Sequence, residues 1–207
     1  MRILEVIRLE RRRILPRYAW IGLALWIPTR VILGESGVPQ RTLLAFGELT
    51  LPLLLLLLSH RGLLPHEGET EVYQATSRPK GLSLAIRLGW LLGWGAMVVV
   101  TLSPSLYGVL MVMAPACLLG GLTLLISGWT QAAIGLGVGL GWWGWAAFHL
   151  VNPERSLDGH LQALLLGFSY AFSGDGLGMT LKYKGAQLLV GLWGYAGALL
   201  VLSRRFR

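Results

Sequence analysis

Few side chains in this sequence could carry out acid/base chemistry within its apolar stretches. Glu48 stands inside a leucine-rich run, His149 lies near the end of another, and Asp158 and His160 follow it. Such groups can move a proton during catalysis, so a polytopic membrane enzyme acting on lipid is one hypothesis. No Ser/His pair at a recognised motif, no paired carboxylates and no aspartate-rich phosphate-binding pattern accompany them. Their isolation counts against the enzyme hypothesis.

The sequence also offers little to hold a metal or a nucleotide. Asp158 and His160 are spaced so that they point to different faces of a helix, with no third ligand nearby. His66 and Glu67 lack the second histidine of a zinc helix, and Cys117 is the sole cysteine. None of the lysines follows a glycine, as a Walker A loop requires. We therefore expect no metal site and no cofactor bound by this chain.

The apolar stretches are long enough to cross a membrane. The chain has 207 residues, of which 54% are hydrophobic and only 14% charged, which is more apolar surface than a soluble domain of this size can bury. Since a spanning helix needs about 20 apolar residues, we predict an all-α integral membrane protein. It forms a single transmembrane domain over 1–207 with six spans, at about 18–34, 42–59, 86–103, 107–127, 131–151 and 187–203.

The basic residues predict the orientation of these spans. Most of the 18 Lys and Arg residues fall on one side if the amino terminus is inside, and short basic segments stay in the cytoplasm. We expect a multi-pass protein of the cytoplasmic (inner) membrane with both termini cytoplasmic. The basic residues that fall outside, or at the outer edge of a span, are Arg30, Arg41, Arg155, Lys182 and Lys184.

The net charge of +8 predicts attraction to anionic lipid headgroups, where each basic residue contributes about 1 kcal/mol. Because the basic residues are divided among segments that flank the spans, we expect no nucleic-acid partner. Residues 1–16 alternate apolar and basic side chains at roughly helical spacing and end at Pro16. They predict a helix that lies in the inner headgroup layer, with a simple basic anchor as the alternative. We expect the span that follows to be retained, because no signal-cleavage site follows it.

One polar passage, 66–81, separates the second and third predicted spans. Its acidic residues favour a helix start, and Pro79 disfavours helix at Arg78. The passage therefore predicts a short helix at the cytoplasmic face. Such a helix is not stable alone, so it requires packing on the spans or a partner. An ordinary solvated loop is the alternative.

This passage, "ETEVYQATSRPKG", resembles the intracellular coupling segment of type-2 ABC exporter permeases. Glu71, Ala75, Thr76 and Arg78 match that segment in character and order. The tight inner turn at 127–131 and the stretch 152–186 resemble, respectively, the junction of the fourth and fifth spans and the outer re-entrant helices before the last span. The proline that usually follows the Ala-Thr pair is missing, and Pro79 arrives later.

The resemblance implies a permease subunit that forms half of the translocation pathway of an ATP-driven exporter. ATP and Mg would be bound by a separate ABC ATP-binding subunit, and a second permease, identical or paralogous, would complete the pathway. An accessory membrane subunit without its own pathway is a further alternative. The residues expected to contact the ATPase subunit are Glu69, Glu71, Tyr73, Gln74, Thr76 and Arg78.

Four glycines recur at every second position in the fifth predicted span. No strand is predicted before them, so they do not form a dinucleotide-binding loop. Their small-xxx-small spacing predicts close helix packing within the subunit, or a dimer face. Three tryptophans beyond them predict membrane-interface anchoring or packing, with substrate stacking as the alternative. The glycines are Gly135, Gly137, Gly139 and Gly141, and the tryptophans are Trp142, Trp143 and Trp145.

Glu48 is the one acidic residue inside a predicted span. An ionised carboxylate there costs at least about 2.5 kcal/mol, so it should face a partner or a wet cavity. Arg30, near the outer end of the first span, is a candidate partner, although it could instead extend to the headgroups. Glu48 would then either line the pathway or make a structural polar contact.

Overall fold

The computed structural model describes Ile7, Val31 and the ranges 40–64, 80–103, 105–151 and 177–205. Within them the chain forms helices and no strands. The helices are α3 (Gln40–Leu63), α5 (Lys80–Leu102), α6 (Leu106–Trp129), α7 (Ala132–Val151) and α9 (Leu177–Arg205). The predicted all-α class is therefore confirmed for the described part of the chain.

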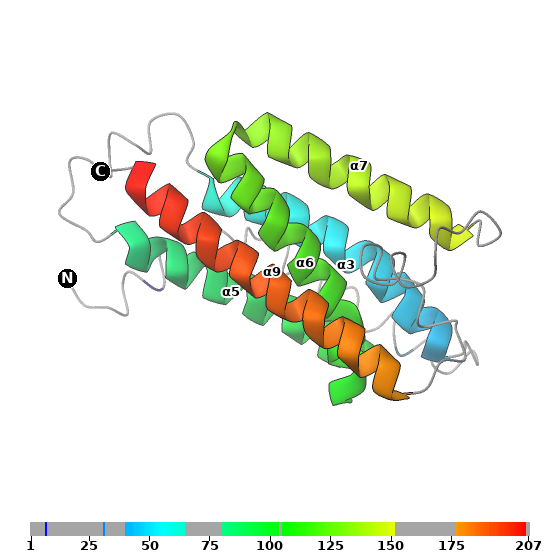
Figure 1. The fold of residues 1–207 in the computed structure, drawn as a ribbon. Coiled ribbons are helices and arrows are strands. Elements are labelled where there is room, and N and C mark those ends of the chain that lie inside the picture. The colour runs from blue at the N-terminus through cyan, green and yellow to red at the C-terminus, as the bar shows by residue number, and fades with distance from the viewer. Residues whose placement is uncertain are drawn as a thin grey trace.

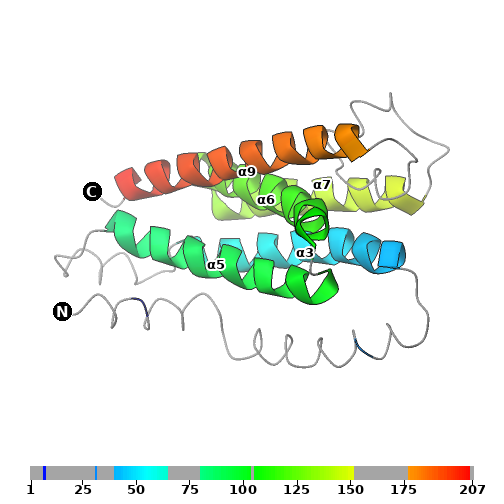
Figure 2. The same ribbon diagram turned by 90° about the horizontal axis from the view of Figure 1, so that it is seen from below.

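These helices run alternately up and down in one bundle (Figure 1). The end of α3, the start of α5, the turn between α6 and α7 and the end of α9 all lie at the same end of the bundle. We call this the Leu63 end and the opposite one the Gln40 end. Figure 2 shows α6 crossing between α3 and α5 on one side and α9 on the other.

Three of the described helices are long and apolar enough to cross a membrane, over Gly81–Thr101, Leu106–Trp129 and Leu181–Arg204. These ranges overlap the predicted spans at 86–103, 107–127 and 187–203. The apolar part of α7, Ala132–Phe148, is shorter than a full span. The described residues thus support three spans rather than the six predicted. The predicted span at 18–34 lies outside the described residues apart from Val31.

Helix α6 is the core of the bundle because small residues let its neighbours approach. Residues 111–121 of α6 are all buried. A Cβ placed on Gly194 of α9 would lie 2.6 Å from the carbonyl carbon of Gly121, so the two helices touch through their backbones. Such contact stabilises helices in lipid, where the hydrophobic effect between helices is absent.

The connections around α6 are short and hydrogen-bonded. Ser105 caps the start of α6, where its side-chain oxygen accepts a hydrogen bond from the Gly108 amide at 3.0 Å. A side chain on Gly108 would collide with Ser103 in the turn from α5. At the other end only Thr130 and Gln131 separate α6 from α7, which forces the two helices to run antiparallel.

Candidate functional site

A buried ion pair joins α3 to α9 near the Gln40 end. Lys184 Nζ of α9 lies 2.6 Å from Glu48 Oε1 of α3, and both residues are 0% exposed. The second carboxylate oxygen, Glu48 Oε2, accepts no hydrogen bond from the described residues. Two opposite charges removed from water must compensate each other, because either one alone would carry a large desolvation cost.

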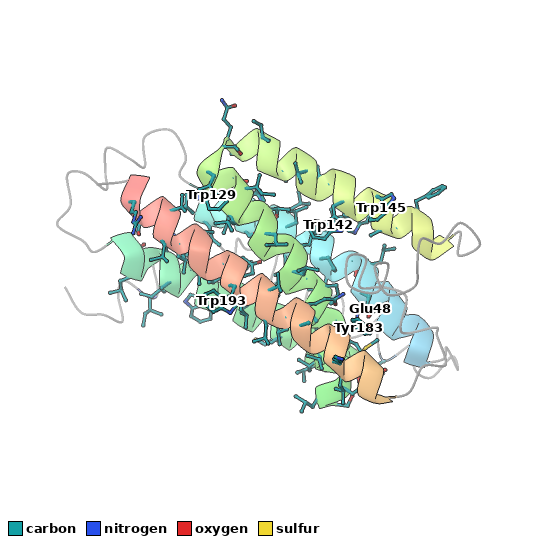
Figure 3. All side chains as sticks on the ribbon, viewed as in Figure 1. Glu48, Trp129, Trp142, Trp145, Tyr183 and Trp193 are labelled. Atoms are coloured by element: carbon teal, nitrogen blue, oxygen red, sulfur yellow. The ribbon has the colours of Figure 1, made fainter. Side chains whose placement is uncertain are left out.

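A buried polar residue and an aromatic residue lie close to Lys184 along α9. Gln187, one helical turn beyond Lys184, is buried on the same face of α9. Tyr183, which precedes Lys184, packs with Tyr107 on the fully buried Met111 of α6. Figure 3 shows Glu48 and Tyr183 in the same part of the bundle, toward the Gln40 end.

The position of Lys184 bears on two predictions. Lys184 was expected outside the membrane or at the outer edge of a span, and it lies in the first turn of the apolar range Leu181–Arg204, with its side chain buried between helices. Glu48 was expected to require a partner, and Arg30 was the candidate. Arg30 lies outside the described residues, and among the residues that the structure describes Lys184 is a cation that contacts Glu48.

A second polar cluster lies at the Leu63 end, where α3 meets α6. His60 Nδ1 lies 2.9 Å from the Leu56 carbonyl oxygen, so this nitrogen carries a proton and donates. His60 Nε2 lies 2.8 Å from Ser127 Oγ, which is also 2.9 Å from the Thr123 carbonyl oxygen. Ser127 has one hydroxyl proton and can donate it to only one of these two neighbours. If His60 is doubly protonated, His60 Nε2 donates to Ser127 Oγ, and the hydroxyl donates to the Thr123 carbonyl oxygen. If His60 is neutral, the hydroxyl donates to His60 Nε2.

The same end is tied to α5 by a buried arginine. Arg87 is 2% exposed, and its Nη1 donates to the Gly62 carbonyl oxygen at 2.8 Å. The last carbonyls of a helix have no amide partner within the helix and attract cations, so Arg87 stabilises the end of α3. Together, His60 and Arg87 connect the last turn of α3 to both α6 and α5.

The coupling residues predicted from the sequence are not described by the structure. Glu69, Glu71, Tyr73, Gln74, Thr76 and Arg78 all lie in the stretch between α3 and α5 that is outside the described ranges. The structure does describe both ends of that stretch. Leu63 and Lys80, where α3 ends and α5 begins, lie at the same end of the bundle.

The glycines of α7 divide between its two faces. A Cβ on Gly139 would lie 2.8 Å from Leu56 of α3 and from Thr123 of α6. Gly135 faces α6, where a Cβ would meet Ser127. Gly137 and Gly141 are exposed and have open space around them. Gly135 and Gly139 therefore make the close helix contacts that were predicted for the four glycines. Gly137 and Gly141 pack against no other described helix.

The three tryptophans of α7 differ in their surroundings. Trp143 Nε1 donates to the Leu49 carbonyl oxygen of α3 at 2.8 Å, which makes Trp143 a packing residue. Trp145 is on the exposed side of α7 at 37% exposure, and Trp142 is half-buried. Interface anchoring and substrate stacking both stay predictions for Trp142 and Trp145.

The groups weighed for acid/base chemistry are not brought together by the described structure. Glu48 is fully buried against Lys184, while Asp158 and His160 lie outside the described residues, as does the side chain of His149. Among the residues that the structure describes, no three His, Cys, Asp or Glu side chains converge as a metal site would require.

Sequence reasoning missed Lys184, His60 and Arg87 as buried polar groups. A signal for Lys184 was present in the helical spacing of α9. Lys184, Gln187, Gly191 and Tyr195 recur at intervals of three to four residues, and all four are buried. A lysine in register with these buried residues faces the helix interface.

No family model, curated protein or solved structure matches this chain. The class of protein is therefore defined by the fold. Several apolar helices of membrane-spanning length, packed around a largely buried helix and an interhelical ion pair, define a multi-pass membrane protein.

Proposed function

We propose that this chain is the membrane-spanning permease subunit of a type-2 ABC exporter. It forms half of a translocation pathway and works with a separate ATP-binding subunit and a second permease. In this proposal the protein has six spans in the inner membrane, both termini in the cytoplasm, an interfacial helix at 1–16 and outer re-entrant helices at 152–186. Residues 66–81 form the cytoplasmic coupling helix, and the Leu63 end of the bundle faces the cytoplasm.

The observation that carries the proposal is the way the two helices flanking the coupling segment are tied together. Arg87 joins the start of α5 to the end of α3 through the Gly62 carbonyl. His60 joins the same turn of α3 to Ser127, close to the turn between α6 and α7. A force applied to the segment between Leu63 and Lys80 would therefore act on three helices at once.

Charge at the two ends agrees with this orientation. The described helices carry five basic residues toward the Leu63 end, which the proposal places in the cytoplasm, and three toward the Gln40 end, in keeping with the preference of basic residues for the cytoplasmic side. The five are Arg61, Lys80, Arg87, Arg204 and Arg205, and the three are Arg41, Lys182 and Lys184. Nucleotide binding by the partner can shift the permease between inward and outward states only through contacts that differ between those states. The coupling segment is the proposed source of such contacts.

The test is co-purification of the full chain from the membrane of its native host. A protein with a Walker A loop should accompany the wild type. Glu71→Arg should lower the recovery of this ATPase about tenfold, because it reverses a charge at the proposed interface. The double change Tyr73→Ala with Gln74→Ala should have a similar effect, because it removes two side chains that would contact the ATPase. Glu35→Arg, a charge reversal in the segment expected outside, is the matched control.

Two results would contradict the proposal. Equal recovery of the ATPase with Glu71→Arg and with Glu35→Arg would contradict the proposal that residues 66–81 bind the ATPase subunit. A purified chain that has no ATPase companion and that alone hydrolyses or transfers groups on lipid would favour the membrane-enzyme alternative instead.

A further inference from the structure

Helix α3 carries a proline between its two polar attachments. Pro52 lies one turn after Glu48 and two turns before His60. It has no backbone N–H, so the Glu48 carbonyl lacks the amide that a continuous helix would supply. Kinks in helices concentrate at such positions, because the missing hydrogen bond and the pyrrolidine ring loosen the turn.

The turn before Pro52 is supported from outside the helix. The Leu49 carbonyl accepts a hydrogen bond from Trp143 Nε1 of α7. Leu49 directly follows Glu48, whose carbonyl lacks a backbone amide partner because of Pro52. Groups on neighbouring helices commonly compensate for a proline-weakened turn in a membrane. The same bond attaches the part of α3 before Pro52 to α7.

The part of α3 after Pro52 is held firmly in the bundle. Leu55, Leu56 and Leu63 are 0% exposed, and His60 contacts Ser127 of α6. Arg87 of α5 contacts the Gly62 carbonyl. This half of α3 is therefore fixed to two neighbouring helices by both packing and hydrogen bonds.

The part of α3 before Pro52 is attached to α9 by the ion pair of Glu48 with Lys184. The attraction between two opposite charges is strong in a water-free interior and weak once water surrounds them. The Glu48–Lys184 pair therefore favours two discrete states, one closed and dry and one open and hydrated, over a gradual separation of α3 from α9. Glu48 Oε2 accepts no hydrogen bond from the described residues, which leaves that oxygen ready for water when the pair opens.

We propose that the Glu48–Lys184 ion pair is a latch that holds the first half of α3 against α9, and that Pro52 is the hinge about which this half moves when the latch opens. The inference goes beyond the proposed permease function and does not depend on it. Because α9 is held to α6 beside the ion pair, where Tyr183 packs on Met111, and further along by backbone contacts at Gly191 and Gly194, the moving part is α3.

The experiment measures distances between paired spin labels on the full chain in lipid nanodiscs, without any ATPase subunit. Cys117→Ala removes the native thiol. Labels at Ala45 and Leu181 report on the side of the hinge next to the latch, and labels at Leu57 and Leu200 report on the other side. Leu57, Leu181 and Leu200 are exposed.

We expect Lys184→Met to add a second, longer distance for the 45/181 pair and to leave the 57/200 pair unchanged. The charge exchange Glu48→Lys with Lys184→Glu should restore the single short distance. Pro52→Ala, added to Lys184→Met, should reduce the population at the longer distance by at least half.

If Lys184→Met yields no folded protein, Glu48→Leu with Lys184→Met carries the same test, since it leaves neither an unpaired charge nor a hydrogen bond between the two positions. An unchanged 45/181 distance in the folded variant would overturn the latch. Parallel changes in both label pairs, or a longer distance that persists fully with Pro52→Ala, would overturn the hinge. Because the nanodiscs contain no ATPase, each of these results is independent of the permease proposal.

Discussion

Gly191 of α9 lies directly against the main chain of Cys117 in α6, with no side chain between the two helices at this point. The contact continues at Gly194, which faces Gly121. These glycine contacts bring the backbones of α6 and α9 together, and the buried face of α9 depends on them. The aromatic ring of Tyr195 fits beside this contact because Gly120 leaves space for it.

Gly191→Ala should therefore destabilise the protein by about 1–3 kcal/mol, since the added methyl overpacks a rigid contact. Gly137→Ala is the matched control, because Gly137 has open space and alanine favours a helix over glycine by about 0.5–1 kcal/mol. Thermal unfolding of both purified variants in the same detergent measures the difference. Equal midpoints would contradict the close contact.

The buried ion pair predicts strong coupling between Glu48 and Lys184. Lys184→Met alone should lower the free energy of unfolding by about 3–5 kcal/mol, because it leaves a buried carboxylate without its cation. Glu48→Leu combined with Lys184→Met should recover most of that loss. Reversible unfolding in mixed micelles gives the double-mutant cycle, and additive effects would show that the two residues do not interact.

Loss of the Arg87 side chain should weaken the end of α3. Arg87→Ala removes a charged donor from the Gly62 carbonyl, which is expected to cost about 1.5–3 kcal/mol. Lys182→Ala, which removes an exposed cation from α9, should change stability by less than about 0.5 kcal/mol. Chemical unfolding of the two variants in one lipid mixture is the measurement. A similar small effect for both would exclude a structural role for Arg87.

Ser127→Ala should leave His60 Nε2 without its partner inside the bundle. The expected loss of stability is about 1–3 kcal/mol. Ser203→Ala is the control, since the Ser203 hydroxyl donates to the Leu200 carbonyl of its own helix. The nitrogen NMR shifts of His60 should also change with Ser127→Ala and not with Ser203→Ala. Unchanged His60 signals in both variants would contradict the hydrogen bond.

Hydropathy predicted the helical class and the location of α5, α6 and α9, because each contains a long and nearly uncharged apolar run. It could not predict which side chains meet between helices. Charge counting placed Lys184 near a span end but could not say which way its side chain faces, and in α9 it faces the neighbouring helices. The contact between Arg87 and Gly62 depends on how α5 packs on α3, which no local pattern encodes.

The ion pair also constrains the order in which the protein can be made. Glu48 precedes Lys184 by 136 residues, so at a synthesis rate of about 5–20 residues per second the carboxylate waits roughly 7–27 seconds for its partner. During that interval α3 would carry a charge that nothing in α9 can yet neutralise. Arrival of Lys184 would thus mark completion of the bundle, and a chain interrupted before α9 would retain an unpaired carboxylate by which the cell could distinguish it from finished protein.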